Sequence, residues 1–275
     1  PPPPPPPPPP PIFFFTPNPP SPMLRSLVGS EMCIRDRCVT AGGSTPSASN
    51  VIDYFEIQTL GNALDFGDMT STTAGGGGLS SPVRGVFSGG YSGDRTRINF
   101  ITIASTGNAT TFGELSRGRG GAATGGNATR GITATGDGVV HHNTIDYITI
   151  ASTGNAIDFG NLTTNRNGTG ALSNSTRGVW GGGETPSSVD TMDYVTLATL
   201  GNAVDFGNMV GNRHNSTEDG ASSPTRGVWA GGQTPNRQNV IQYITIGTTG
   251  NAVDFGDLLA DKANPAAASN SHGGL

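Results

Sequence analysis

Residues 177–183 read RGVWGGG, and after the loop ETPSSVDT the chain continues as MDYVTLATLGNAVDFGNM to residue 209. The same unit is written five times, in the segments 37–83, 84–129, 130–176, 177–225 and 226–275, which begin at Arg37, Arg84, Arg130, Arg177 and Arg226. The starts are 46 to 49 residues apart. A period of this length with strand signals in each copy predicts an array of small antiparallel sheets, as in a β-propeller.

Each copy can be divided into four strands. The Arg-Gly-Val-aromatic run is one, the stretch Ile145–Ile150 is typical of the next, and the run Val/Ile-Asp-Phe-Gly is the third. A weaker strand, such as 168–172, precedes the next Arg. The Gly-Asn pair between the second and third runs predicts a two-residue hairpin, since both residue types tolerate a positive φ. Antiparallel order then puts near-identical turns on one face and the loops that differ between copies on the other.

The two ends of the repeat region predict a closed ring. The first copy starts directly at the strand that begins with Arg37, whereas the chain finishes with a strand-like segment, 266–272, that has no such strand after it. We therefore expect an all-β fold of about five four-stranded blades, closed by pairing of the C-terminal strand with the first blade. A larger ring or an open array is the alternative.

Residues 1–36 have a different character. They hold a run of prolines, three phenylalanines and a further Pro-rich stretch, a composition typical of a linker that cannot bury a core. The segment 27–36, LVGSEMCIRD, resembles the translation of a sequencing adapter. We interpret residues 1–36 as disordered or artefactual, and a genuine Pro-rich leader is the alternative. Proline interrupts every apolar run here, which is unlike a secretory signal.

Composition narrows the class of partner. Glycine contributes 43 of 275 residues, 33% of residues are hydrophobic and 13% are charged. Thin blades tolerate so few apolar residues because each blade buries its faces against its neighbours. The net charge of −5 argues against a nucleic-acid partner, and no apolar run approaches the ~18 residues of a membrane helix. Of two cysteines, only Cys38 lies in the repeats, so no disulfide framework is expected.

The repeat resembles the kelch family of β-propellers. The glycine doublet after an apolar strand, a first aromatic such as Tyr194 and a second such as Phe206 carry the resemblance, with a basic residue following in four copies, at Arg117, Arg166, Arg213 and Lys262. Phe replaces the usual Trp at the second aromatic, and the third copy has Thr135-Gly136 in place of its doublet. The text is also similar to repeat proteins of marine phage and plankton collections, which implies a virion or cell-surface role.

Several motifs invite a more specific interpretation. The recurrent Asp-Phe-Gly matches a kinase tripeptide, but the other kinase elements do not accompany it. We expect its Phe to pack between blades, and we hypothesise that its Asp pairs with the Arg of a blade start. His141 and His142 are too few for a metal site, and no copper-oxidase or sialidase pattern is found. Trp180 and Trp229 share one blade position, where packing is favoured over a sugar-stacking platform.

We therefore expect a non-enzymatic binding or structural propeller without catalytic residues, metal or cofactor, which recognises a protein or glycan through its variable loops. These loops span 44–50, 91–97, 137–144, 184–191 and 233–239, and rigid scaffolds commonly carry their binding residues on such loops. The alternative is a glycan-acting hydrolase or oxidase with its site in the central channel. The candidate ligand-binding residues are Tyr91, Asp94, Arg95, His142, Glu184 and Arg237.

Overall fold

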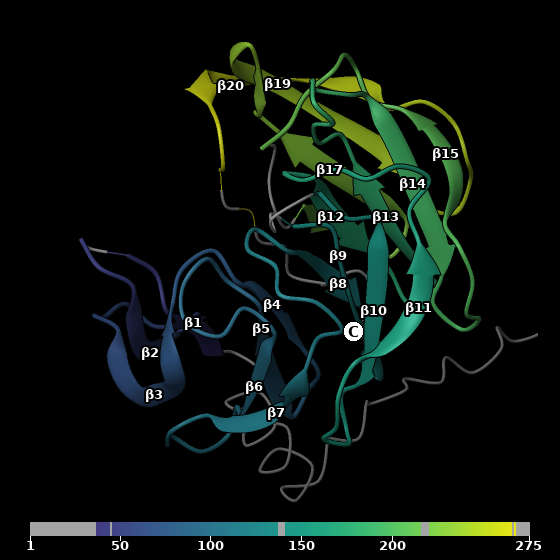
Figure 1. The fold of residues 1–275 in the computed structure, drawn as a ribbon. Coiled ribbons are helices and arrows are strands. Elements are labelled where there is room, and N and C mark those ends of the chain that lie inside the picture. Colours follow the sequence, from purple (N-terminus) through teal and green to yellow (C-terminus); the bar gives the residue numbers. More distant parts are fainter. Residues whose placement is uncertain (1–36, 45, 137–140, 216–219, 266, 268–275) are drawn as a thin grey trace, which may run out of the picture. The chain divides into compact units, whose positions relative to one another are not determined.

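The chain divides into two units, 1–36 and 37–275. The computed structural model describes residues 37–44, 46–136, 141–215, 220–265 and 267, so the predictions for residues 1–36 lie outside the described residues. All the elements described are β-strands, and they form five antiparallel sheets that follow one another along the chain (Figure 1). Residues 37–275 are a five-bladed β-propeller, as the repeats predict.

Within blades 1 to 4, strands run in sequence order from the inside outward, each paired antiparallel with the next. Blade 1 contains β1 (Arg37–Ala41), β2 (Ser49–Glu56) and β3 (Leu64–Thr73). Blade 2 contains β4 (Gly77–Ser80), β5 (Arg84–Ser88), β6 (Arg97–Thr102) and β7 (Thr110–Glu114). Blade 3 contains β8 (Ala123–Gly126), β9 (Arg130–Ala134), β10 (Thr144–Thr149) and β11 (Ile157–Asn161).

The last two blades repeat this order. Blade 4 contains β12 (Gly170–Ser173), β13 (Arg177–Gly181), β14 (Thr191–Thr196) and β15 (Val204–Asn208). Blade 5 contains β16 (Ala221–Ser222), β17 (Arg226–Ala230), the short β18 (Gln233–Thr234), β19 (Asn236–Thr245) and β20 (Val253–Lys262). In blade 5, β19 pairs with β17, β18 and β20. The innermost strands β4, β8, β12 and β16 line a central channel of about 450 Å³.

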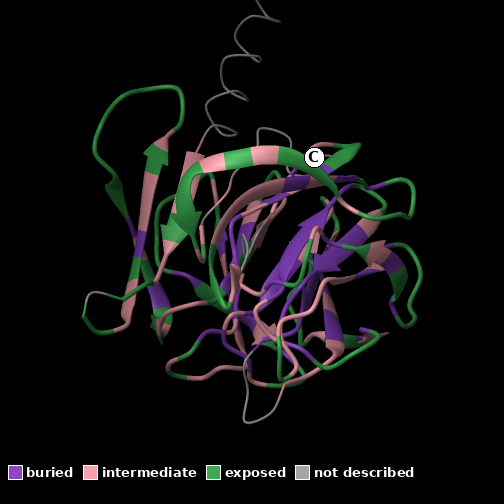
Figure 2. Ribbon diagram, turned by 90° about the horizontal axis from the view of Figure 1, so that it is seen from above, coloured by how far each residue is buried: buried purple, intermediate pink, exposed green. Residues whose placement is uncertain are grey.

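The hydrophobic core is divided among the junctions between consecutive blades. Four clusters of buried side chains are found in the described residues, one at each junction from blade 1–2 to blade 4–5. The buried residues lie mainly on the inner strands and on the parts of the blades that face a neighbouring blade (Figure 2). At these junctions the second aromatic of each copy is 2–3% exposed, which confirms that it packs between blades; these residues are Phe66, Phe112, Phe159 and Phe206. Trp180 and Trp229 are fully buried in the same clusters, so the alternative of a sugar-stacking platform is wrong.

The Gly-Asn pairs form hydrogen bonds between neighbouring blades. The prediction that each pair forms the two-residue turn of a hairpin is wrong. The strands do pair as a hairpin, but seven residues, such as 150–156, connect them. Gly154 N donates to Phe112 O of the preceding blade at 2.8 Å, and Asn155 Oδ1 accepts from Glu114 N at 3.1 Å. Blades 1–2, 3–4 and 4–5 repeat both bonds. The pair is therefore fixed by contacts between blades, which a local turn rule does not consider.

The junction between blade 5 and blade 1 differs. Phe255 of β20 is 56% exposed and Ile57, after β2, is 63% exposed, whereas their counterparts Phe206 and Ile246 are buried. Among the described residues no backbone bond joins blade 5 to blade 1 in the way that the other junctions are joined. The predicted closing strand, 266–272, lies outside the described residues apart from Ala267, which lines the channel.

Candidate binding site on the variable-loop face

The loops that differ between copies gather on one face, as expected. The β5–β6 and β7–β8 connections meet there, because Arg119 N donates to Arg95 O and Leu115 N donates to Thr96 O. The near-identical turns lie on the other face, where Ile103 N donates to Val83 O. We call the first of these the variable-loop face.

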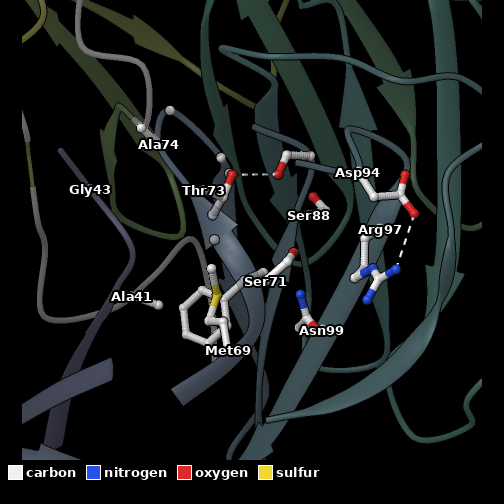
Figure 3. A pocket seen from close by; sticks show the side chains of 16 residues that line it. Ala41, Gly43, Met69, Ser71, Thr73, Ala74, Ser88, Asp94, Arg97 and Asn99 are labelled. Atoms are coloured by element: carbon white, nitrogen blue, oxygen red, sulfur yellow. Dashed lines mark hydrogen bonds and ion pairs between the residues drawn. The ribbon is translucent and has the colours of Figure 1, made fainter. Parts of the chain in front are cut away.

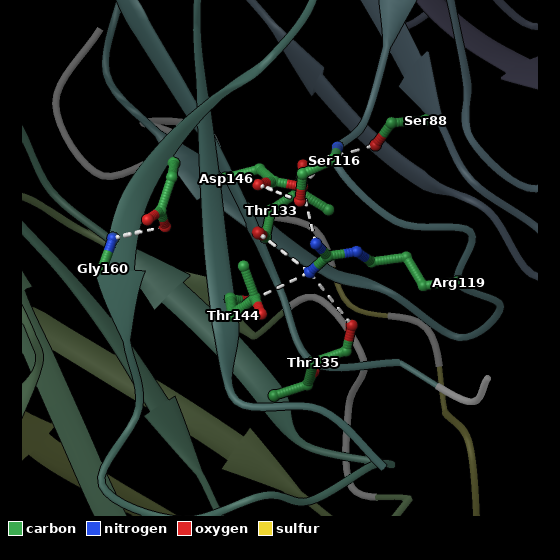
Figure 4. Close-up of polar contacts among 9 residues, drawn as sticks. Ser88, Ser116, Arg119, Thr133, Thr135, Thr144, Asp146 and Gly160 are labelled. Carbon is green, nitrogen blue, oxygen red and sulfur yellow. Dashed lines mark hydrogen bonds and ion pairs between the residues drawn. The ribbon is translucent and has the colours of Figure 1, made fainter. Parts of the chain in front are cut away.

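At this face, one arginine side chain is buried at each of three junctions between blades. It stands seven residues after the buried Phe, at Arg119, Arg166 and Arg213. Arg119 Nη2 donates to Asp146 Oδ2 at 2.6 Å, and its Nη1 donates to Thr144 O at 3.0 Å (Figure 4). Both side chains are fully buried. Arg166 and Asp193 repeat the pair at 2.6 Å, so at these two junctions one guanidinium satisfies a buried carboxylate.

The remaining partners of this carboxylate are also repeated. Asp146 accepts hydrogen bonds from the backbone and hydroxyl of Ser116, and Asp193 accepts the same pair of bonds from Thr163. Burial lowers the pKa of the Arg119 and Arg166 guanidinium groups, and the attraction of the paired aspartate opposes this effect. Because arginine starts from a very high pKa, both guanidinium groups stay protonated at neutral pH. At blades 4–5, Gln242 replaces the aspartate and accepts from Val210 N.

The junction between blades 1 and 2 lacks both charged residues. Thr73 stands where the next three junctions have arginine, and Asn99 stands where two of them have Asp146 or Asp193. The Thr70 hydroxyl still donates to Asn99 Oδ1 at 2.6 Å, and Thr73 Oγ1 donates to Gly89 O at 3.3 Å. Since a threonine is much shorter than an arginine, a cavity of about 260 Å³ is left at this position (Figure 3). We call it the blade 1–2 cavity.

A charged pair stands at the rim of the blade 1–2 cavity. Arg97 Nη2 lies 3.3 Å from Asp94 Oδ2, and the two side chains are about one-third exposed. Asp94 Oδ1 also accepts from the hydroxyl and the backbone of Thr96. These bonds from Thr96, and then Arg97, lower the pKa of Asp94. The rim therefore presents an ionised carboxylate and a guanidinium whose positions are fixed by the β5–β6 loop.

The six residues predicted to bind ligand are spread over four blades. Asp94 lines the blade 1–2 cavity, and the ring of Tyr91 lies against the backbone of Gly75 at its edge and of Gly120 and Gly121. Arg95 lies close to Gly118, in the connection between β7 and β8.

The other three predicted residues belong to blades 3, 4 and 5, whereas the cavity lies between blades 1 and 2. His142 precedes β10, where burial and then Arg117 and Arg119 lower its pKa. Glu184 lies 3.7 Å from His214 Nε2 in blade 4, and Arg237 is exposed on β19. The structure thus places Asp94 in the cavity lining and Tyr91 beside it, and leaves His142, Glu184 and Arg237 on separate blades.

The sequence interpretation missed three residues of this site: Thr73, Asn99 and Arg97. A signal was available in the repeats, because the residue seven positions after the conserved Phe is basic in four copies and threonine in one. In the second copy the matching residue is Arg119, not Arg117, which was assigned to that position from the sequence.

The central channel is the second concave surface. Its lining in the described residues consists of small and apolar side chains with Arg37, Asn127 and several hydroxyls, and it includes no carboxylate or histidine. Cys38 lies in this lining, where burial raises the pKa of its thiol. A thiol with a raised pKa is largely protonated at neutral pH and is a poor nucleophile. No group of three His, Cys, Asp or Glu side chains that could hold a metal occurs in the part of the chain that the structure describes.

No protein-family model matches this chain, and no curated protein matches it. Its class therefore follows from its own geometry: a five-bladed β-propeller whose uniform features build the frame and whose variable face carries a cavity. Within the described residues, no helix is long and apolar enough to cross a membrane.

Proposed function

We propose that residues 37–275 form a non-enzymatic recognition module that binds a protein or glycan through the variable-loop face. The observation that carries the proposal is the blade 1–2 cavity, which lies on that face and has a fixed Asp94–Arg97 pair at its rim. Concave sites with a few oriented polar groups are the usual form of a ligand site. The rest of the propeller holds the loops in place.

The chemistry of the two concave surfaces favours binding over catalysis. A glycosidase needs two carboxyl groups across the scissile bond. Asp94 is the one carboxylate in the described lining of the blade 1–2 cavity, and the described channel lining contributes none. The enzyme alternative, a hydrolase or oxidase in the channel, therefore lacks support from a specific group of residues.

The kelch-like pattern and the sequence of the repeats suggest where the protein acts. We propose a virion or cell-surface location, where a rigid propeller with variable loops would meet a glycan or a protein. The partner is not nucleic acid, since a chain with a net charge of −5 repels phosphates.

The test is to measure binding of the full chain, fluorescently labelled, to a glycan array and to a panel of purified surface proteins. The variant D94A/R97A removes the rim of the cavity, and D205A, an exposed aspartate on β15, is the control. We expect binding that D94A/R97A weakens at least tenfold and D205A leaves unchanged. Equal binding by both variants would contradict the assignment of the face. Any bound glycan is then incubated with the protein, and release of new reducing ends would favour the enzyme alternative.

A further inference from the structure

The blade 1–2 cavity is a modified copy of a position that the protein fills elsewhere with its own side chain. At blades 2–3 and 3–4 the guest is an arginine of the chain, which bonds to an aspartate and to backbone carbonyls. At blades 1–2 the arginine is replaced by Thr73 and the aspartate by Asn99. The two changes together remove one positive and one negative charge, so the cavity keeps polar groups but no unbalanced buried charge.

This charge balance restricts the kind of ligand. A cationic guest, such as the arginine of a peptide, would find Asn99 where its counterparts find a carboxylate, and the Arg97 guanidinium already lines the cavity. An anionic guest would meet Asp94 at the rim. Burying an ionised group without a partner is strongly unfavourable. The cavity therefore favours a neutral guest.

The lining also requires a guest that is polar over much of its surface. The hydroxyls of Ser71, Thr73 and Ser88 and the amide of Asn99 line the cavity, and each of these groups can both donate and accept hydrogen bonds. Thr73, Ser88 and Asn99 each make one side-chain hydrogen bond within the chain, and a polar guest can use their remaining donor and acceptor positions, which a purely apolar guest would cover without replacing water, at a cost in free energy. Met69 and Phe87 provide an apolar wall on which carbon atoms of a guest can pack.

Size gives a third restriction. The volume of about 260 Å³ lies just below the ~300 Å³ at which pockets for small molecules begin. A single six-membered ring fits this description, whereas an extended chain does not. A guest that is neutral, rich in hydroxyls and apolar on its C–H faces is a sugar.

We propose that the blade 1–2 cavity binds one neutral sugar ring, as the terminal residue of a glycan. Asp94 and Arg97 at the rim accept from and donate to adjacent hydroxyls, and Asn99 bonds to the deepest part of the ring. The proposal rests on the recognition function proposed above and specifies its ligand class.

The experiment uses the full chain and a panel of neutral methyl glycosides, which includes hexosides, a deoxyhexoside and N-acetylhexosaminides, with agmatine and methyl glucuronoside as charged comparators. Binding is measured by saturation-transfer and two-dimensional NMR. We expect at least one neutral glycoside to bind with a millimolar Kd and to shift the Asn99 resonances, and we expect the charged probes to bind at least tenfold more weakly. Binding of agmatine alone would overturn the proposal in favour of a peptide arginine.

The decisive variant is T73R/N99D, which gives this junction the Arg–Asp pair of its neighbours. Because the pair fits the other junctions, we expect the variant to fold and to lose glycoside binding more than tenfold. The control is T164R/N165D, which makes the same charge changes at exposed residues after β11 and should bind normally. If T73R/N99D does not fold, D94A must show the loss instead.

The outcomes separate this proposal from the proposed function. Glycoside binding that T73R/N99D leaves unchanged overturns the sugar site but not recognition by the face. Absence of glycoside binding also overturns the sugar site, and array binding that depends on Asp94 and Arg97 would still support the recognition function.

Discussion

Arg166 donates to Asp193 across the junction of blades 3 and 4 at 2.6 Å, and both side chains are fully buried. The pair stands next to the hydrophobic cluster of the same junction, and its carboxylate also accepts two bonds from Thr163. In the described residues, the four junctions from blades 1–2 to blades 4–5 are thus held by apolar packing together with a buried polar group. Because a buried ion pair depends on both partners, removal of one partner should have a large effect.

We expect D193N to lower the free energy of unfolding by about 3 kcal/mol, because it leaves the guanidinium of Arg166 buried without a counter-ion. The double variant R166T/D193N reproduces the neutral pair of blades 1–2 and should lose less than D193N alone. Urea unfolding followed by circular dichroism measures both. D205N, at an exposed aspartate, is the control and should change the free energy by less than about 0.5 kcal/mol. A double variant less stable than the single one would contradict the role of charge.

The glycine after the conserved Phe tests the contact between blades. Gly160 has φ +146°, and a Cβ there would lie 2.3 Å from Gly201 O of the next blade. Gly256 has φ +140° and no atom near its would-be Cβ. We expect G256A to lose about 1 kcal/mol from backbone strain, and G160A to lose a further ~1–3 kcal/mol from overpacking. Thermal or urea unfolding measures the difference, and equal losses would show that the close approach between blades is unimportant.

The sequence led to the hypothesis that the arginine at each blade start pairs with the aspartate of Asp-Phe-Gly, and this hypothesis is wrong. Asp158, Asp205 and Asp254 are exposed and accept from the amide two residues later. The arginine lies instead over the first aromatic of its own copy, as Arg177 does over Tyr194 at 4.6 Å, and Arg177 Nη1 donates to Ile246 O of the next blade at 2.9 Å. A planar guanidinium can stack and donate at once, so the hypothesis named the right residue and the wrong partner.

This arrangement predicts different effects of one substitution at two blades. R177K should lose about 1–2 kcal/mol of unfolding free energy, since lysine loses both the stacking and the directed bond. Arg226 stacks on Tyr243 at 4.5 Å, but the described residues show no carbonyl acceptor for it on blade 1. R226K should therefore lose about 0.5 kcal/mol, the value of an exposed stack alone. Chemical unfolding of both variants checks this order, and a larger loss for R226K would contradict it.

The sequence predicts the frame of this protein well and its site only in part. Strand number, the faces of the loops and the packing of Phe206 follow from features that every copy repeats. The role of Asn155 could not be predicted locally, because its bond to Glu114 joins residues 41 positions apart. The third copy shows the same limit: Thr135 adopts φ 56°, normally a glycine conformation, and its buried hydroxyl lies 2.8 Å from that of Thr169.

The cavity escaped prediction for a related reason. Thr73 and Asn99 are 26 positions apart and look ordinary in so Thr- and Asn-rich a chain. Their importance appears only when Arg119 and Asp146 are seen to meet one blade later. Asp94 was identified because charged residues in variable loops are common recognition groups, whereas Thr73 lies in a strand.

The conserved Phe gives a last test, at two positions that differ in burial. Phe206 is 2% exposed and packs with Met209 and Trp229, whereas Phe255 is 56% exposed on β20. We expect F206A to lose about 3–5 kcal/mol of unfolding free energy, the usual range for a buried Phe. F255A should lose about 1 kcal/mol or less, since much of its ring already contacts water. Urea unfolding of the full chain measures both. If F255A proves as damaging as F206A, then Phe255 is covered in solution, and the junction between blade 5 and blade 1 is packed like the other four.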